Sequence, residues 1–258
     1  MLSCEPIVGV MRAVHPRFGE WRRSTLSAFS QENLKRVPLT DLAPTQMTVG
    51  MREVDHKRQR WRERSADEAV NFLNQLRIPV VLGPGARPYL LDRHHLALAL
   101  HNEGVKELLV SIAADMSCLP RNEFWRGLES RGCARPVDAH GRIRSYNDMP
   151  ATLDGLQDDP FRSLSWAVKK AGGYVKDEAP FSEFHWADFL RGRIALEMVE
   201  RDFAHTQALA MRIARSAEAA VLPGWHPSAD ASGEPCGPSG IPTGELNPVV
   251  SSSKAPGQ

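Results

Sequence analysis

The four residues 92–95, Asp-Arg-His-His, combine an acid, a guanidinium and two imidazoles in one short stretch. They follow an apolar run at 89–91 and precede a segment with helical periodicity that ends at Gly104. The pattern predicts a strand, a tight turn and a helix, with the polar residues in the turn. Unpaired backbone N–H groups and the dipole at a helix N-terminus favour an anion. We therefore expect this turn to bind a phosphate.

Each side chain of the turn has a candidate role in phosphate chemistry. Arg93, with His94 or His95, could add charge-assisted hydrogen bonds to a phosphate. Asp92 could hold a magnesium ion or act as a base toward a hydroxyl group. The predicted catalytic residues of the turn are therefore Asp92, His94 and His95. The alternative is that Asp92 only caps the helix and that both histidines lie on the surface, but capping leaves the Arg-His-His sequence unexplained.

A second polar cluster, residues 53–58, follows a strand predicted from the alternation of apolar and other residues at 47–51. Ligands of α/β sheets gather at the carboxyl ends of strands, so this cluster could face the first. Glu53 is its predicted catalytic acceptor, and Asp55 is an alternative proton acceptor or metal ligand. The predicted phosphate ligands of the cluster are His56, Lys57 and Arg58. The alternative interpretation is that residues 53–58 are a solvated, charged segment at the end of the strand, without a role in binding.

The same segment is strongly basic, with five lysines and arginines between residues 57 and 64 around Trp61. Clustered cations beside an aromatic ring could contact nucleic acid. The predicted nucleic-acid patch consists of Arg60, Arg62 and Arg64. Short basic runs are also common on solvated helix surfaces, which is the alternative interpretation.

Two further sets of residues have simple explanations. His94 and His101 are seven residues apart and could share a helix face, but no acid or cysteine stands at ligand spacing, so the pattern favours no metal site. Seven aromatic residues of the second half are expected to form the core of a helical part. They are Trp125, Phe161, Trp166, Phe181, Phe184, Trp186 and Phe189.

The order of predicted elements indicates an α+β fold, with a small mixed β-sheet and packed helices followed by an α-helical C-terminal part. Residues 38–116 are expected to form the phosphate-binding domain, and residues 117–220 a helical extension that ends in a long helix at 194–220. Residues 1–37 are predicted to be a poorly ordered leader. Pro, Gly and Ser make up half of residues 221–258, which predicts a disordered tail.

Composition excludes several classes of protein. The net charge is +1, from 32 basic and 31 acidic residues, so no global basic field attracts nucleic acid. The four cysteines form no Cys-x-x-Cys pair, which argues against a zinc knuckle and fits a reducing cytosol. There is no signal-peptide pattern and no apolar run of 18 residues. We therefore expect a cytoplasmic protein without a membrane span.

With these motifs, the chain resembles the ParB/sulfiredoxin-like superfamily, and in particular its ParB-like nuclease branch. Residues 49–58 resemble the first signature of that branch. Residues 89–97 resemble the superfamily's phosphate-binding turn, in which a glycine often stands at the place of Arg93. Residues 158–166 and 184–190 resemble the branch's helical C-terminal part.

The resemblance covers roughly residues 37–215 and implies a site for the phosphates of a nucleotide such as ATP, ADP or CTP, with Mg²⁺ as the metal for Asp92. It also implies that Lys57 and Arg58 complete the phosphate cradle around the turn. Relatives include CTP-dependent DNA clamps, sulfiredoxin and free-serine kinases. No helix-turn-helix or dimerisation coil is evident after the predicted sheet, and sulfiredoxin's catalytic cysteine has no counterpart here, so neither of those two activities is expected.

Two classes of function follow from the sequence. The first is an enzyme, either a ParB-like nuclease or a nucleotide-dependent phosphotransferase, which binds a nucleotide or phosphodiester between the two polar clusters. The second is a non-catalytic DNA-binding or partition accessory protein that uses the basic run at 58–64.

Overall fold

A computed structural model of the chain describes residues 34–177 and 179–227. The predicted leader up to residue 33, and the predicted tail from residue 228 onward, lie outside the described residues. Within the described part, no helix has the length and apolar composition needed to cross a membrane.

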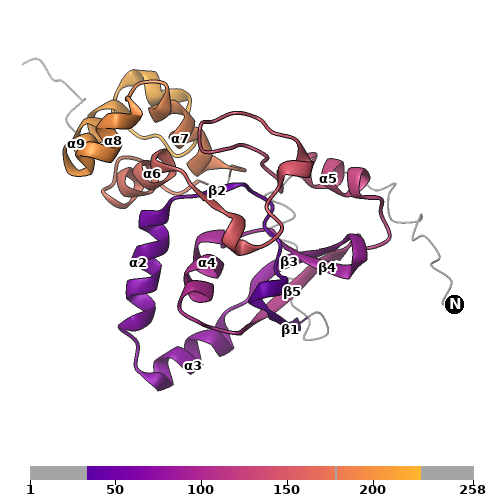
Figure 1. Cartoon of the computed structure of the whole chain (residues 1–258). Helices are drawn as coiled ribbons and strands as arrows, with labels where there is room; N and C mark the ends of the chain where they lie inside the picture. Colours follow the sequence, from indigo (N-terminus) through magenta and orange to yellow (C-terminus); the bar gives the residue numbers. More distant parts are fainter. Residues whose placement is uncertain (1–33, 178, 228–258) are drawn as a thin grey trace, which may run out of the picture. The chain divides into compact units, whose positions relative to one another are not determined.

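A mixed four-stranded sheet forms the centre of the N-terminal half, as predicted (Figure 1). Its strand order is β1-β5-β3-β4, in which β3 and β5 are parallel and the other two pairs are antiparallel. The strands are β1 (Leu34–Pro38), β3 (Ile78–Gly83), β4 (Arg87–Leu90) and β5 (Glu107–Asp115). The sheet thus contains, as β4, the predicted strand that precedes the polar turn.

The first strand begins earlier than the sequence pattern indicated. Leu34 to Val37 were predicted to belong to the leader, but they pair with β5, where Val37 lies opposite Leu108. Val37 is buried in the core, whereas Lys35 and Arg36 are exposed. One apolar side chain and two solvated ones give too weak a periodic signal to mark a strand, although backbone pairing holds it in the sheet.

The first half of the chain contains three helices, which are α2 (Met51–Arg62), α3 (Ala66–Gln75) and α4 (His94–Asn102). Of these, α4 packs on the sheet and α2 packs on α4 (Figure 1). The Ser-x-x-Glu sequence at 65–68 forms a capping box at the start of α3, where Ser65 accepts from the Glu68 N–H and Glu68 accepts from the Ser65 N–H. Helix α4 contributes Leu98 and Leu100 to the apolar core with the sheet, and α2 contributes Val54.

The predicted strand at 47–51 is much shorter in the structure. Only β2 (Thr48–Val49) is extended, and it pairs in parallel with β6 (Gln157–Asp158). Helix α2 starts at Met51, whose N–H donates to the Asp158 carboxylate at 2.8 Å. The polar cluster at 53–58 therefore lies on a helix and not at a strand end, because contacts with a segment 107 residues away fix where the helix begins.

The C-terminal half is helical, as predicted. Its helices are α5 (Arg121–Glu129), α6 (Pro160–Lys170), α7 (Ser182–Arg191), α8 (Leu196–Arg201) and α9 (Phe203–Ala214). Asp159 caps α6 through its carboxylate, which accepts from the Phe161 N–H at 2.9 Å, in an Asp-Pro sequence of the kind that favours a helix start. The single long helix predicted at 194–220 is wrong. The chain leaves helical geometry at Asp202 (φ −145°, ψ 85°), whose side chain caps α9.

The predicted aromatic core is only partly correct. Phe161, Trp186 and Phe189 pack in the core of α6–α9, and Trp125 packs in a separate core against the sheet. The other three aromatic residues of the set belong to none of the three apolar clusters, although Phe184 is buried at 5% exposed, and each contacts a cationic side chain. They are Trp166, Phe181 and Phe184.

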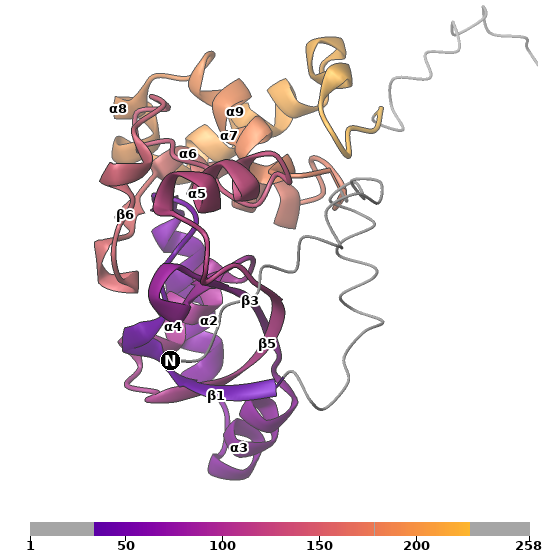
Figure 2. The same cartoon turned by 90° about the vertical axis from the view of Figure 1, so that its right-hand side faces the viewer.

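The N-termini of α2 and α6 are held together by the β2–β6 pair, and Figures 1 and 2 both show α6–α9 grouped near the start of α2. Gly50, just before α2, lies so close to α6 that a Cβ there would be 2.6 Å from the Ser163 backbone nitrogen. The Arg52 N–H also donates to the Ser163 hydroxyl at 3.2 Å. A side chain at position 50 would therefore force the two helices apart.

We expect Gly50→Ala to lower the free energy of unfolding by about 1 to 3 kcal/mol, because backbone atoms must move to admit the methyl group. Gly192→Ala is the matched control, since a Cβ there would meet its nearest atoms at 3.7 Å, an ordinary contact. Urea unfolding of both variants measures the difference. Equal stability of the Gly50 variant and the wild type would contradict the close approach of α2 and α6.

Candidate functional site

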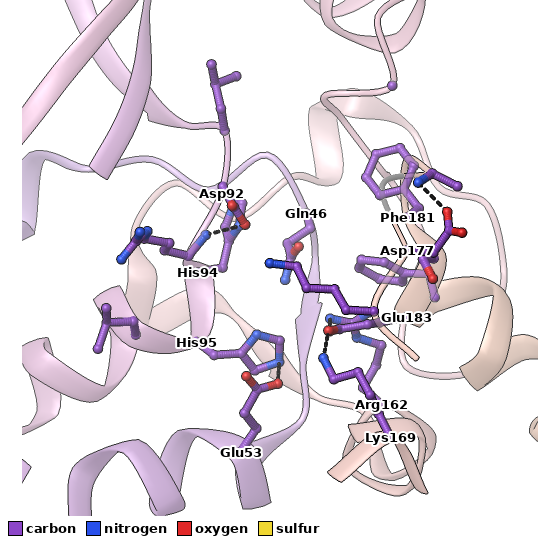
Figure 3. Close-up of a pocket in the computed structure, with 18 of the residues that line it drawn as sticks. Gln46, Glu53, Asp92, His94, His95, Arg162, Lys169, Asp177, Phe181 and Glu183 are labelled. Atoms are coloured by element: carbon purple, nitrogen blue, oxygen red, sulfur yellow. Dashed lines mark hydrogen bonds and ion pairs between the residues drawn. The ribbon is translucent and has the colours of Figure 1, made fainter. Parts of the chain in front are cut away.

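A cleft of about 420 Å³ lies between the sheet-containing half and the C-terminal helices (Figure 3). One wall is formed by the turn between β4 and α4 together with α2. The other wall is formed by α6, the start of α7 and the segment that connects them. The charged residues that line this central cleft are Glu53, Lys57, Asp92, Arg93, Arg162, Lys169, Lys176, Asp177 and Glu183.

The predicted strand, turn and helix are present, and the N-terminus of the helix lies at the cleft. Arg93 is the N-cap of α4 and its side chain makes no capping hydrogen bond. His94, His95 and Leu96, which form the first turn of α4, all line the cleft. Asp92 accepts a hydrogen bond from the Arg93 N–H at 2.8 Å. The N-terminus of α4 is thus placed where it can stabilise an anion in the cleft.

Arg93 occupies a backbone position that favours glycine. Its φ and ψ are 64° and 28°, in the left-handed region, which costs a residue with a Cβ about 1 to 2 kcal/mol. This geometry gives a physical reason for the glycine that the superfamily often has at this position. Here the chain places an exposed guanidinium at the mouth of the site instead.

Both histidines of the turn are buried, so the alternative in which they lie on the surface is wrong. The Thr45 N–H donates to His94 Nε2 at 3.1 Å, and the Gly50 N–H donates to His95 Nε2 at 3.0 Å. Burial lowers the pKa of His94 to about 4, and it lowers the pKa of His95 well below the ordinary value. Both rings are therefore neutral in the ligand-free chain, where each accepts a backbone N–H.

The structure brings part of the second predicted cluster to the turn. Glu53 and Lys57 lie one helical turn apart on α2, and Lys57 Nζ is 3.0 Å from the Glu53 carboxylate. The other Glu53 oxygen lies 3.4 Å from His95 Nε2 (Figure 3). The two polar clusters thus meet in the cleft, across a helix face rather than at the ends of neighbouring strands.

The remaining predicted phosphate ligands do not line the cleft. Arg58 donates to Glu103 at 2.7 Å and to Asp55 at 3.1 Å. His56 lies against Trp166 on another face of α2. Helical geometry explains the difference, because residues 53 and 57 share a face from which residues 56 and 58 point away.

The predicted nucleic-acid patch is largely occupied by internal contacts. Arg62 donates to both oxygens of Glu103, at 2.6 and 2.7 Å. The guanidinium of Arg64 lies over the Phe72 ring, 4.1 Å from its centre. Of the three predicted residues, only Arg62 forms an ion pair within the described part of the chain, and Arg64 donates to the Arg60 carbonyl at 2.7 Å. The three arginines therefore do not form a continuous free basic surface.

Arg162 is the most informative cleft residue, and the sequence analysis did not identify it. Its side chain is only 4% exposed, yet Nε and Nη1 have no hydrogen-bond partner in the structure. Its guanidinium carbon lies 3.6 Å from the centre of the Phe184 ring, and Nη2 is 3.8 Å from Glu183. A buried cation with unpaired donors is energetically costly unless another group satisfies those donors.

Two more charged residues of α6 and α7 complete this wall. Lys169 forms an ion pair with Glu183. Burial raises the pKa of Glu183, but the charges of Arg162 and Lys169 outweigh this effect and hold the pKa below its usual value. Glu183 is thus an internal anion beside two cations of the cleft. No local sequence signal marked these residues, because each is an ordinary charged position on a helix.

The predicted magnesium site has one candidate ligand rather than a cluster. In the ranges 34–177 and 179–227, no group of three or more His, Cys, Asp or Glu residues has a geometry that could hold a metal ion. His101, the other histidine considered for a metal, contacts Asp154 at 2.9 Å. A Mg²⁺ ion at Asp92 would therefore take most of its oxygen ligands from a bound phosphate and water.

Comparison with known proteins gives a family and a related structure. The sequence model of the family described as "Putative ParB-like nuclease" matches residues 35–192. The crystal structure of protein Atu1540 from Agrobacterium tumefaciens is similar, with 47% sequence identity and a TM-score of 0.71. The match covers 75% of this chain and 96% of that one. No protein with curated annotation matches the sequence.

We expect Arg93→Gly to be more stable than Arg93→Ala by about 1 kcal/mol, because only glycine relieves the left-handed backbone while both variants lack the guanidinium. The same pair at the exposed helical residue Gln59 should show the reverse order, since glycine destabilises a helix by about 1 kcal/mol relative to alanine. Urea unfolding measures all four variants. The same order at both positions would contradict the left-handed conformation of Arg93.

We also expect stability to fall as the pH drops from 6.5 toward 4. In this range His94 becomes protonated in the unfolded chain but not in the folded chain. The free energy of unfolding therefore falls by up to about 3 kcal/mol. His94→Gln keeps an acceptor for the Thr45 N–H and does not titrate. The slope of the variant's free energy of unfolding against pH should be smaller than that of the wild type. The difference should be at most about 1.4 kcal/mol per pH unit. Identical pH profiles for variant and wild type would refute a buried neutral His94.

Proposed function

The chain belongs to the ParB-like nuclease family, and we propose that its central cleft binds the phosphate of a nucleotide or phosphodiester and performs phosphoryl chemistry on it. The observation that carries this proposal is Arg162, whose unpaired donors are buried beside the start of α4. An anion between the two walls would satisfy those donors and gain from the helix dipole as well.

The cleft offers cations to a phosphate from both walls. Arg93 and Lys57 stand on the side of the turn, and Arg162 and Lys169 stand on the side of α6. A phosphate that reaches Arg162 and Lys169 would compete with the Glu183 carboxylate for them. Fixed cations around a transferring phosphoryl group stabilise the negative charge of the transition state, which is the main protein contribution to such reactions.

The acids of the cleft are candidates for proton transfer. Asp92 and Glu53 both line the cleft, and either could accept a proton from an attacking water or hydroxyl group. Attack by water would cleave a phosphodiester, as the family description suggests, whereas attack by a hydroxyl group would transfer a phosphoryl group. Mg²⁺ would enter with the nucleotide, held by Asp92 and the phosphate oxygens. His94 and His95 support the site by holding its backbone, as neutral rings.

The alternative, a non-catalytic DNA-binding protein that uses the basic run of α2, has less support. Arg62 is paired with Glu103, and Arg64 covers Phe72. The cleft, by contrast, contains the buried guanidinium of Arg162, whose Nε and Nη1 lack hydrogen-bond acceptors. A protein that binds DNA only through the surface of α2 would not need such a buried cation.

We expect ATP, ADP, CTP or pyrophosphate, tested with and without Mg²⁺, to raise the melting temperature of the wild type, and Arg162→Met to abolish this shift. The ligand-free Arg162→Met protein should melt no lower than the wild type, because methionine removes a buried charge and keeps much of the packing. The matched control is Arg191→Met, whose guanidinium is paired with Asp159 at 2.7 Å. It should melt lower and keep the ligand-dependent shift.

Failure of every ligand to shift the melting temperature, or an undiminished shift in Arg162→Met, would contradict the binding proposal. Catalysis is tested on the same samples by release of phosphate or cleavage of an oligonucleotide. Asp92→Asn and Glu53→Gln should retain the ligand-dependent shift, and at least one of them should lose turnover. Full turnover in both variants would remove these acids from the mechanism.

A further inference from the structure

A second hollow, of about 610 Å³, lies on a different face of the same two helices, and we call it the α2–α6 groove. It shares no lining residue with the central cleft. Its aromatic and basic lining residues are Arg52, His56, Trp166, Lys170 and Phe203. The groove is thus separate from the phosphate site, although α2 and α6 contribute to both.

Trp166 is the central residue of the groove. It is half-buried and belongs to none of the apolar cores that the described residues build. Its ring contacts the His56 ring at a centre distance of 5.3 Å, and Lys170 Nζ lies 5.1 Å from the ring centre. Lys170 Nζ is also 3.3 Å from His56 Nε2. The indole ring of Trp166 therefore lies in the groove with the ammonium group of Lys170 beside it.

A second cation–aromatic pair lies in the same hollow. The Arg52 guanidinium carbon is 3.7 Å from the centre of the Phe203 ring. Arg52 and His56 line the groove, and Arg60 follows at the same helical spacing on α2, one turn beyond the lining residues. The acid of the lining, Asp55, forms an ion pair with Arg58 at 3.1 Å. The surface therefore combines stacking faces with an excess of positive charge.

We propose that the α2–α6 groove binds single-stranded nucleic acid, with an unpaired base stacked on Trp166 and backbone phosphates paired with Arg52, Arg60 and Lys170. Aromatic rings flanked by cations are the elements that single-strand sites use, since every base has a face that can stack. A duplex offers phosphates but no free base face. The proposal goes beyond phosphate binding in the cleft and does not depend on it.

The test is the affinity of the full-length protein for a fluorescein-labelled 20-mer of deoxythymidine, measured by anisotropy over a range of salt concentrations. Trp166→Ala should weaken binding by a factor of about 5 to 100 with an unchanged salt dependence, because stacking involves no ion release. Lys170→Ala should lower the slope of log K against log salt by about 0.7, the value for one phosphate contact on a single strand. Trp166→Phe should keep most of the affinity.

Arg62→Ala is the matched control, since it also removes one cation and lies on α2, but its guanidinium is already paired with Glu103. It should bind the oligonucleotide within about twofold of the wild type, a change well below that expected for a lost stacked base. Thermal unfolding must show that Trp166→Ala remains folded, which we expect because Trp166 lies outside the cores.

Wild-type affinity in both Trp166→Ala and Lys170→Ala would overturn the proposal, as would equal affinity for a duplex of the same length. Arg162→Met separates this site from the cleft. If that variant loses the oligonucleotide while Trp166→Ala retains it, the strand binds in the central cleft and the groove proposal fails. A nucleotide-dependent thermal shift without oligonucleotide binding would support the cleft and reject the groove.

Discussion

Two buried imidazoles at the start of α4 determine where the backbone of residues 45–50 runs. His94 accepts the Thr45 N–H and His95 accepts the Gly50 N–H, so each ring replaces a backbone carbonyl as hydrogen-bond partner. That segment contains β2, whose pairing with β6 places α2 against α6. Both walls of the cleft, and the groove beside it, depend on this placement. An unpaired buried N–H costs about 1 to 3 kcal/mol, so these two bonds constrain the whole arrangement.

The apolar cores and the polar cleft have different roles in the same fold. The cores of the sheet and of α6–α9 are separate, and each is closed by aliphatic and aromatic side chains. A third apolar core joins α5 to the sheet, whereas the central cleft between the turn and α6 is lined by charged residues, including Arg162 with its unpaired donors. Charged groups at such a junction reduce the stability of the ligand-free chain, whereas a bound anion would offset their desolvation.

The sequence predicted those features that local patterns determine. The strand, turn and helix around residues 92–95, the capping box at Ser65 and the Asp159 cap all rest on neighbouring residues, and the structure contains each of them. Features set by distant contacts were not predictable in this way. The neutral state of the histidines depends on burial, and the early start of α2 depends on Asp158. Arg162 lines the cleft only because of how α6 packs. The residues around it in the sequence do not reveal this packing.

The lining of the cleft has consequences for how a ligand would reach it. Five cationic residues and four carboxylates line the cleft, so their fields largely cancel a few ångströms outside it. Long-range electrostatic steering would then contribute little to the rate of association, and ionic strength would affect that rate only weakly. Selection among anions would take place after entry, through the geometry of individual contacts. A cleft of this kind favours discrimination between similar phosphates over rapid capture of any polyanion.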